Sequence, residues 1–126
     1  MHAPENIQLY DLTFLRQMLP NETDTVQMIE IFITSTPVIV ADINEACQQR
    51  DDDKLAKNAH QLKPSLDLIG IVSLKEEIRK IDKLSKVQQL TDGELRTIVE
   101  YLNNVLRQVF DQLHEEFGQI EGATEL

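Results

Sequence analysis

The sequence contains no tryptophan, and its tyrosine and phenylalanine residues make up only 5% of the chain. A folded core must therefore be built mainly from aliphatic side chains. Glycine and proline are also scarce, with four of each among 126 residues. Because sandwiches and barrels need many tight turns, this scarcity argues against them and favours long helices.

Cysteine and basic residues are few as well. A single cysteine, Cys47, excludes an intramolecular disulfide and a cysteine-rich zinc site. Its place in an apolar stripe predicts a small buried residue. Lys and Arg number 12 against 22 Asp and Glu, giving a net charge of -10. Nucleic acids and anionic membrane surfaces attract clusters of basic residues, so we expect neither as a partner.

Targeting and membrane signals are missing from the pattern of the chain. No basic N-terminal region precedes an apolar run, and we see no apolar run close to membrane-spanning length. We therefore expect a soluble, cytoplasmic protein. The length and the 41% hydrophobic content suit one domain, which we place at residues 1–126 with a core from about 10 to 117.

Apolar residues recur at alternating spacings of three and four, which is typical of amphipathic helices. A short helical stretch is expected at 10–18. A long helix follows, with apolar residues from Val26 to Cys47, and Pro37 inside it predicts a bend. A third helix is expected to end at Gly70. Its apolar stripe consists of Leu55, Ala59, Leu62, Leu66 and Ile69.

Two more helices are each predicted to begin with a capping box, in which a Ser or Thr and a Glu three residues later cap each other's backbone. Ser73 with Glu76 gives one box, and Thr91 with Glu94 gives the other. The apolar positions of these two helices are Leu74, Ile78, Ile81 and Leu84, then Leu95, Ile98, Leu102, Val105, Val109, Leu113 and Phe117. No strand-like alternation is present. The fold class predicted is all-α, an antiparallel up-down four-helix bundle with a short extra N-terminal helix.

One histidine of the third helix, His60, lies away from the apolar stripe. Because a helix turns about 100° per residue, His60 points roughly 140° away from that stripe, toward solvent. Lys57 and Lys63 lie one turn to either side of it. An exposed imidazole between two cations suits the carriage of a negatively charged group, and histidine is substantially neutral and nucleophilic at neutral pH. Geometry and charge alone do not separate this role from an incidental surface histidine.

The segment 59–70, AHQLKPSLDLIG, resembles the signature of the histidine phosphotransfer (HPt) domain of multistep two-component phosphorelays. The matching positions are Ala59, His60, Leu62, Lys63, Ser65, Ile69 and Gly70. The proline-containing helix before the segment and the capped helices after it are also similar to the family, so the resemblance covers about 10–117. The departure is Pro64, where the family usually has glycine. Proline removes the amide that would bond the His60 carbonyl, which predicts a mild kink there.

By this resemblance, His60 is the phosphoacceptor, which receives a phosphoryl group from an aspartate of a receiver domain and passes it to another. Lys63 would stabilise the phosphoryl oxygens, and Ser65 would be a helper or a structural hydrogen-bonding group. The resemblance implies a monomeric module without an ATP site or autonomous catalysis. Its partners would be a response-regulator receiver domain and/or a hybrid sensor histidine kinase, with Mg²⁺ held by the receiver. We expect no cofactor and no metal on this chain itself.

The partner is expected to dock around His60. Residues expected to contact it are Ala56, Lys57, Pro64, Asp67, Leu68 and Ile71.

Two alternatives stay open at this point. The dimerisation domain of a sensor histidine kinase also has a histidine followed by a basic residue and a proline. There the proline usually falls five residues after the histidine and an ATP-binding domain follows, whereas Pro64 falls four residues after His60 and no such domain is seen in this sequence. The other alternative is a non-catalytic helical interaction module in which His60 is not phosphorylated by a receiver.

Overall fold

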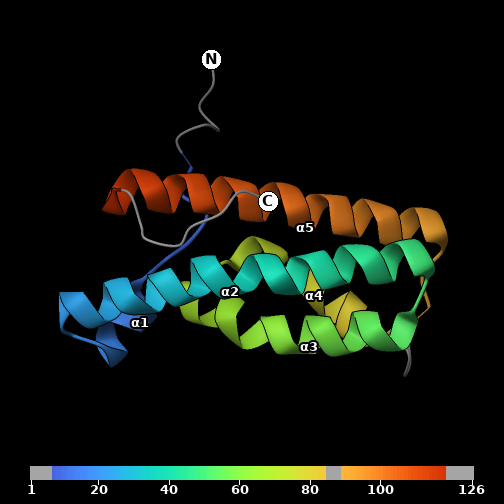
Figure 1. Ribbon diagram of the computed structural model, residues 1–126, viewed down its shortest axis with the longest axis horizontal. Helices are drawn as coiled ribbons and strands as arrows, with labels where there is room; N and C mark the ends of the chain where they lie inside the picture. The colour runs from blue at the N-terminus through green and yellow to red at the C-terminus, as the bar shows by residue number, and fades with distance from the viewer. Residues whose placement is uncertain (1–6, 85–88, 119–126) are drawn as a thin grey trace, which may run out of the picture.

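The computed structural model describes residues 7–84 and 89–118 (Figure 1). Within these ranges every regular element is helical, which confirms the all-α prediction. The elements are α1 (Thr13–Met18), α2 (Glu22–Gln49), α3 (Asp52–Ile69), the 3-10 turn η2 (Val72–Leu74), α4 (Lys75–Asp82) and α5 (Asp92–Phe117). The sequence also predicts a loose lead at 1–6, a short polar linker at 86–90 and a frayed tail from Gly118 onward, and all or most of each segment lies outside the described residues.

The long helices α2, α3 and α5 run alongside one another, with α4 behind them and α1 at one end (Figure 1). α2 packs against α3 and α5, and α3 packs against α4. The chain thus forms the predicted bundle with a short N-terminal helix. The fourth helix is much shorter than the other three.

α2 continues from Glu22 to Gln49 with Pro37 inside it. Since proline has no N–H, the carbonyl of Ile33 loses its usual partner. The hydroxyl of Ser35, two residues before Pro37, donates to the carbonyl of Ile31 at 2.7 Å. Such side-chain bonds to the helix backbone are typical of bent helices, and the bend itself stays a prediction.

α2 is also the one helix in the described ranges that is long and apolar enough to span a membrane, judged by length and composition alone. Its most apolar window has a mean hydropathy of 1.5. Our expectation that no run approaches this length was therefore wrong by that criterion. In the bundle, the apolar side of α2 is buried against its neighbours, as in the core helix of many helical bundles.

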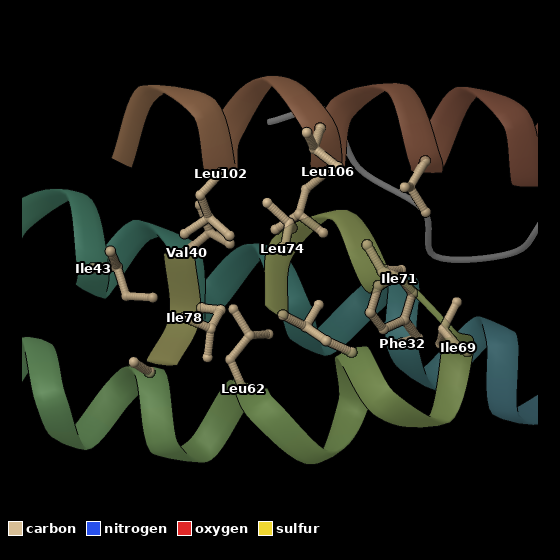
Figure 2. Close-up of a cluster of buried hydrophobic side chains, with 14 of the residues drawn as sticks. Phe32, Val40, Ile43, Leu62, Ile69, Ile71, Leu74, Ile78, Leu102 and Leu106 are labelled. Carbon is tan, nitrogen blue, oxygen red and sulfur yellow. The ribbon is translucent and has the colours of Figure 1, made fainter. Parts of the chain in front are cut away.

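The core is aliphatic, as the composition predicts, with one edge-to-face aromatic contact between Phe32 and Phe110. Side chains from α2, α3, α4 and α5 meet in it (Figure 2). The predicted stripe of α3 is buried throughout. The buried side of α5 differs from expectation, since it also includes Val99, Leu106 and Phe110, whereas Ile98 and Phe117 are only half-buried. Cys47 is also only half-buried, because it borders a groove described below.

The start of α4 differs from the capping box predicted for Ser73 and Glu76. Leu74 precedes α4 without a side-chain cap, and the hydroxyl of Ser73 is buried with no hydrogen-bond partner among the described residues. The turn η2 occupies the place of the predicted capping box. The box formed by Thr91 and Glu94 at the start of α5 is present and confirmed.

The C-terminal end of α3 is fixed by Gly70. This residue has φ 72°, in the left-handed region that favours glycine, as the sequence predicts. The N–H of Asp11 donates to the carbonyl of Ile69 at 3.1 Å, and a Cβ on Gly70 would lie only 2.2 Å from the Asp11 carbonyl oxygen. Glycine is therefore required for both the turn and the close approach of the segment before α1.

Candidate functional site

His60 projects from the middle of α3 into solvent. Its side chain is 77% exposed, which confirms the predicted orientation. The stripe on the other side of α3, from Leu55 to Ile69, is buried in the core and fixes the rotation of the helix. The backbone that carries His60 is thus rigidly supported while the imidazole is accessible.

A carboxylate that the sequence analysis missed lies beside this histidine. Oδ1 of Asp82, the last residue of α4, is 3.4 Å from Nδ1 of His60. The Asp82 side chain is only 16% exposed. The signal that was available is its spacing: Asp82 follows the buried Ile78 by four residues, so it lies on the side of α4 that faces the bundle. The sequence alone does not show which helix Asp82 faces there, because that depends on how α4 packs.

Asp82 gives the two ring nitrogens different roles. A carboxylate accepts hydrogen bonds, so it favours a proton on the nearby Nδ1 and leaves the lone pair of Nε2 free. The separation of 3.4 Å is a close polar contact that is longer than a strong hydrogen bond. An acidic group is thus in contact with His60 in addition to the two lysines predicted near it.

The cationic residues predicted around His60 are at the surface. Lys57 and Lys63 are exposed, one turn before and after His60. Neither forms an ion pair with another residue in the described part of the chain. Their charges are therefore available to a negatively charged group held at His60. Ser65 is half-buried beyond Lys63.

Pro64 is exposed, and α3 continues through it without interruption. Because it has no N–H, it cannot bond the carbonyl of His60. The exposed position explains how the residue is tolerated, since its ring displaces no core side chain. The kink that we predict at this point stays a prediction.

The residues expected to dock a partner divide into two groups. Lys57, Pro64 and Asp67 are exposed and Leu68 is half-buried, so all four present surface near His60. Ala56 and Ile71 are 7% and 2% exposed. For these two the expectation is corrected, since a buried side chain offers a partner almost no contact area.

Apolar surface near the end of α3 was not predicted. Phe14 of α1 is 54% exposed and Val72 of η2 is 72% exposed. Together with Asp67 and Lys75 they border a shallow pocket of about 290 Å³. The sequence signal was Phe14 and Met18, which are four residues apart and lie away from the buried Leu15. Exposed apolar residues of this size mark interaction surfaces when they are grouped.

Metal ligands are not gathered anywhere in the described ranges: no group of three or more His, Cys, Asp or Glu side chains is arranged to hold an ion there.

Comparison with known families agrees with this arrangement. A sequence model of the Hpt domain matches residues 27–123, which is most of the chain. The chain therefore belongs to the Hpt domain family. Membership implies a carrier of phosphoryl groups in phosphorelays that interacts with receiver domains or kinases. Membership of this family also favours a phosphotransfer domain over the first alternative, the dimerisation domain of a sensor histidine kinase. No curated protein and no solved structure matches the chain.

Proposed function

We propose that this protein carries a phosphoryl group on Nε2 of His60 and relays it between receiver-domain aspartates of a two-component phosphorelay. The observation that carries the proposal is the arrangement of His60, which is exposed on a rigid helix with Asp82 at its Nδ1. In the forward step, the Nε2 lone pair attacks the phosphorus of a receiver's aspartyl phosphate. The N–P bond forms as the P–O bond to the aspartate breaks, and the receiver's carboxylate is released. The Nδ1 proton stays on the ring, beside Asp82.

Lys63 supports this chemistry by its charge. An ammonium group one turn from His60 attracts the oxygens of the transferring phosphoryl group. Ser65, half-buried five residues after His60, serves as a helper or as a structural hydrogen-bonding group. The chain supplies no ATP site in this proposal and acts as a carrier rather than an enzyme with its own catalysis. The Mg²⁺ that neutralises the phosphoryl group is held by the receiver.

The partner approaches the face that contains His60. Its polar rim is Lys57 and Asp67, Pro64 and Leu68 add apolar surface near His60, and Phe14 with Val72 forms a further apolar part at the end of α3. This combination of an apolar patch with a charged rim is usual for protein interfaces. The proposed partner is a response-regulator receiver domain, free or in a hybrid sensor kinase. We further propose that the carrier acts as a cytoplasmic monomer.

Phosphoryl transfer from a phosphorylated receiver tests the proposal. The wild-type protein, a His60→Gln variant and a His114→Gln control are each mixed with a panel of radiolabelled receivers. The proposal expects acid-labile, alkali-stable label on the wild type and on the control, and none on His60→Gln. Label that persists on His60→Gln would show that another residue is the phosphoacceptor. A folded wild type that takes no label from any receiver would favour a non-catalytic interaction module.

A further inference from the structure

A second surface feature lies on a face to which neither α3 nor α4 contributes. A groove of about 950 Å³ runs between the C-terminal half of α2 and residues 92–107 of α5. These two helices lie side by side along this length (Figure 1). His60 is on α3, so the groove is separate from the phosphoryl site. Its volume is within the range of ligand-binding clefts.

Part of the seam between α2 and α5 that borders the groove is polar. Asn44 of α2 and Asn103 of α5 hydrogen-bond to each other, with Nδ2 of Asn103 2.9 Å from Oδ1 of Asn44 and the reverse pair at 3.3 Å. Asn103 also donates to the carbonyl of Val99 at 2.8 Å, while Asn44 keeps a second N–H for another partner. This pair joins the helices and leaves the space beside it unfilled.

Positive charge is concentrated along the groove. Three of the five arginines of the chain border it, although the net charge of the whole sequence is -10. Arg50 is already used: it bonds to Asp52 at 2.8 Å and to Asp92 at 2.6 Å. Arg96 and Arg107 are exposed, and no carboxylate of a described residue lies within ion-pair distance of either. Two guanidinium groups are thus available to an anionic ligand.

Apolar side chains lie between these arginines. Leu95 and Val99 are buried at the bottom of the groove. Cys47 borders it from α2 and is half-buried, and this burial raises the pKa of its thiol, which therefore stays neutral. One free acid, Glu100, also borders the groove. Among the described residues, two unpaired arginines and one unpaired acid therefore border the groove, and Cys47 is its accessible apolar side chain.

The spacing of the two arginines limits the shape of the ligand. Arg96 and Arg107 are eleven residues apart on one helix, which places them about 16 Å apart along its axis at about 1.5 Å per residue. An extended peptide covers that length in about five residues, at about 3.3 Å each. A small anion would reach only one of the two.

We propose that the groove between α2 and α5 binds an extended acidic peptide segment of a partner protein. Two carboxylates about five residues apart would pair with Arg96 and Arg107, and an apolar side chain between them would lie in the groove beside the half-buried Cys47. Charge favours an acidic over a basic segment. A basic segment is attracted to most of this acidic surface, whereas an acidic one is attracted locally to this groove, which gives specificity. The inference does not depend on the proposed phosphotransfer.

Titration of the labelled protein with a defined peptide tests the inference. The probe is a six-residue peptide with glutamate at both ends and leucine between them, and the control peptide has glutamine at both ends. Amide chemical shifts of the ¹⁵N-labelled protein are followed by NMR. We expect saturable shifts at Asn44, Arg96, Val99 and Asn103, and at least tenfold weaker binding of the control peptide.

Matched variants separate the groove from a general charge effect. Arg96→Gln and Arg107→Gln should each weaken binding of the glutamate peptide about threefold or more, by loss of one charge-assisted contact. Arg79→Gln removes the same charge from α4, outside the groove, and should leave binding unchanged. The inference is overturned if the shifts spread over other faces, if the two peptides bind alike, or if all three variants behave alike. The amide shifts that the peptide causes in the wild-type protein locate the binding site directly, so they test the inference even where a variant folds poorly.

Discussion

Oδ1 of Asp82 lies 3.4 Å from Nδ1 of His60, although the two residues belong to different helices. The buried position of Asp82 holds the carboxylate in place, while the imidazole is exposed to a partner. In the proposed transfer, the pair orients the ring so that Nε2 faces the partner as the nucleophile. In this role Asp82 is a positioning residue and touches no phosphoryl oxygen.

Replacing Asp82 with alanine is expected to slow phosphoryl transfer to His60 about tenfold, equivalent to about 1.4 kcal/mol of activation free energy. The variant loses the group that favours the Nδ1–H tautomer. Imidazole ¹⁵N shifts should show the proton of the neutral ring moving toward Nε2 in Asp82→Ala, and a purely structural role would not produce this change. Asp111→Asn, an exposed acid on α5, serves as the control for charge. An unaltered tautomer with an unaltered rate would remove Asp82 from the site.

Lys63→Ala is expected to lower the transfer rate about tenfold or more while leaving helical content intact, because the ammonium group stabilises charge on the transferring phosphoryl group. The side chain is exposed, so its removal creates no cavity. Lys54→Ala is the matched control, since Lys54 is on the same helix but pairs with Glu45 at 3.4 Å. Equal transfer rates for Lys63→Ala and the wild type, measured from the same receiver, would exclude this role.

Pro64→Ala is expected to stabilise the fold by about 1–3 kcal/mol, because it restores the N–H that bonds the His60 carbonyl and removes the clash of the ring. Pro64 is exposed, so no packing is lost. Urea unfolding measures the difference in the free energy of unfolding, with Gln61→Ala on the same helix as the control. A Pro64→Ala variant no more stable than the wild type would show that α3 accommodates the ring without loss.

Gly70→Ala and Gly93→Ala are expected to have opposite effects on the free energy of unfolding. At Gly70 a methyl group meets the Asp11 backbone and a left-handed φ, so the cost should be about 2–4 kcal/mol. At Gly93 nothing lies within 4 Å of the added Cβ, and alanine in the first turn of α5 should stabilise by about 0.5–1 kcal/mol. Thermal or urea unfolding of both variants is the measurement. Equal effects of the two substitutions would contradict the close approach of Asp11 to Gly70.

The helices and their buried sides were predictable because each helix must bury one apolar stripe, and the spacing of that stripe is written in the sequence. The outward position of His60 follows from the same rotation. Its contact with Asp82 was not predictable, since it depends on how α4 rotates and where it crosses α3. The exposed Phe14 and Val72 were missed for a similar reason. Their grouping depends on the turn from α3 into η2 at Gly70 and on the segment before α1, in which the N–H of Asp11 bonds to the carbonyl of Ile69.

The two predicted capping boxes show that local sequence alone does not determine how a helix begins. Ser73 and Thr91 are each followed by glutamate at the third position, yet only Thr91 caps a helix. The tight connection from Gly70 turns Val72–Leu74 into a 3-10 helix and buries Leu74, so Ser73 is directed inward rather than toward the backbone of α4. A pattern of local hydrogen bonds was therefore overridden by the burial of one leucine.

This difference predicts different costs for the same type of substitution. Thr91→Ala removes the hydroxyl that accepts from the N–H of Glu94 at 3.1 Å, and should cost about 1 kcal/mol of stability. Ser73→Ala removes a buried hydroxyl that has no partner among the described residues, and should be neutral or stabilise by up to about 1 kcal/mol. Urea unfolding of the two variants, with circular dichroism as the probe, separates these outcomes. A Ser73→Ala variant that loses as much stability as Thr91→Ala would mean that Ser73 caps α4 in solution, and the capping box read from the sequence would then hold at both helices.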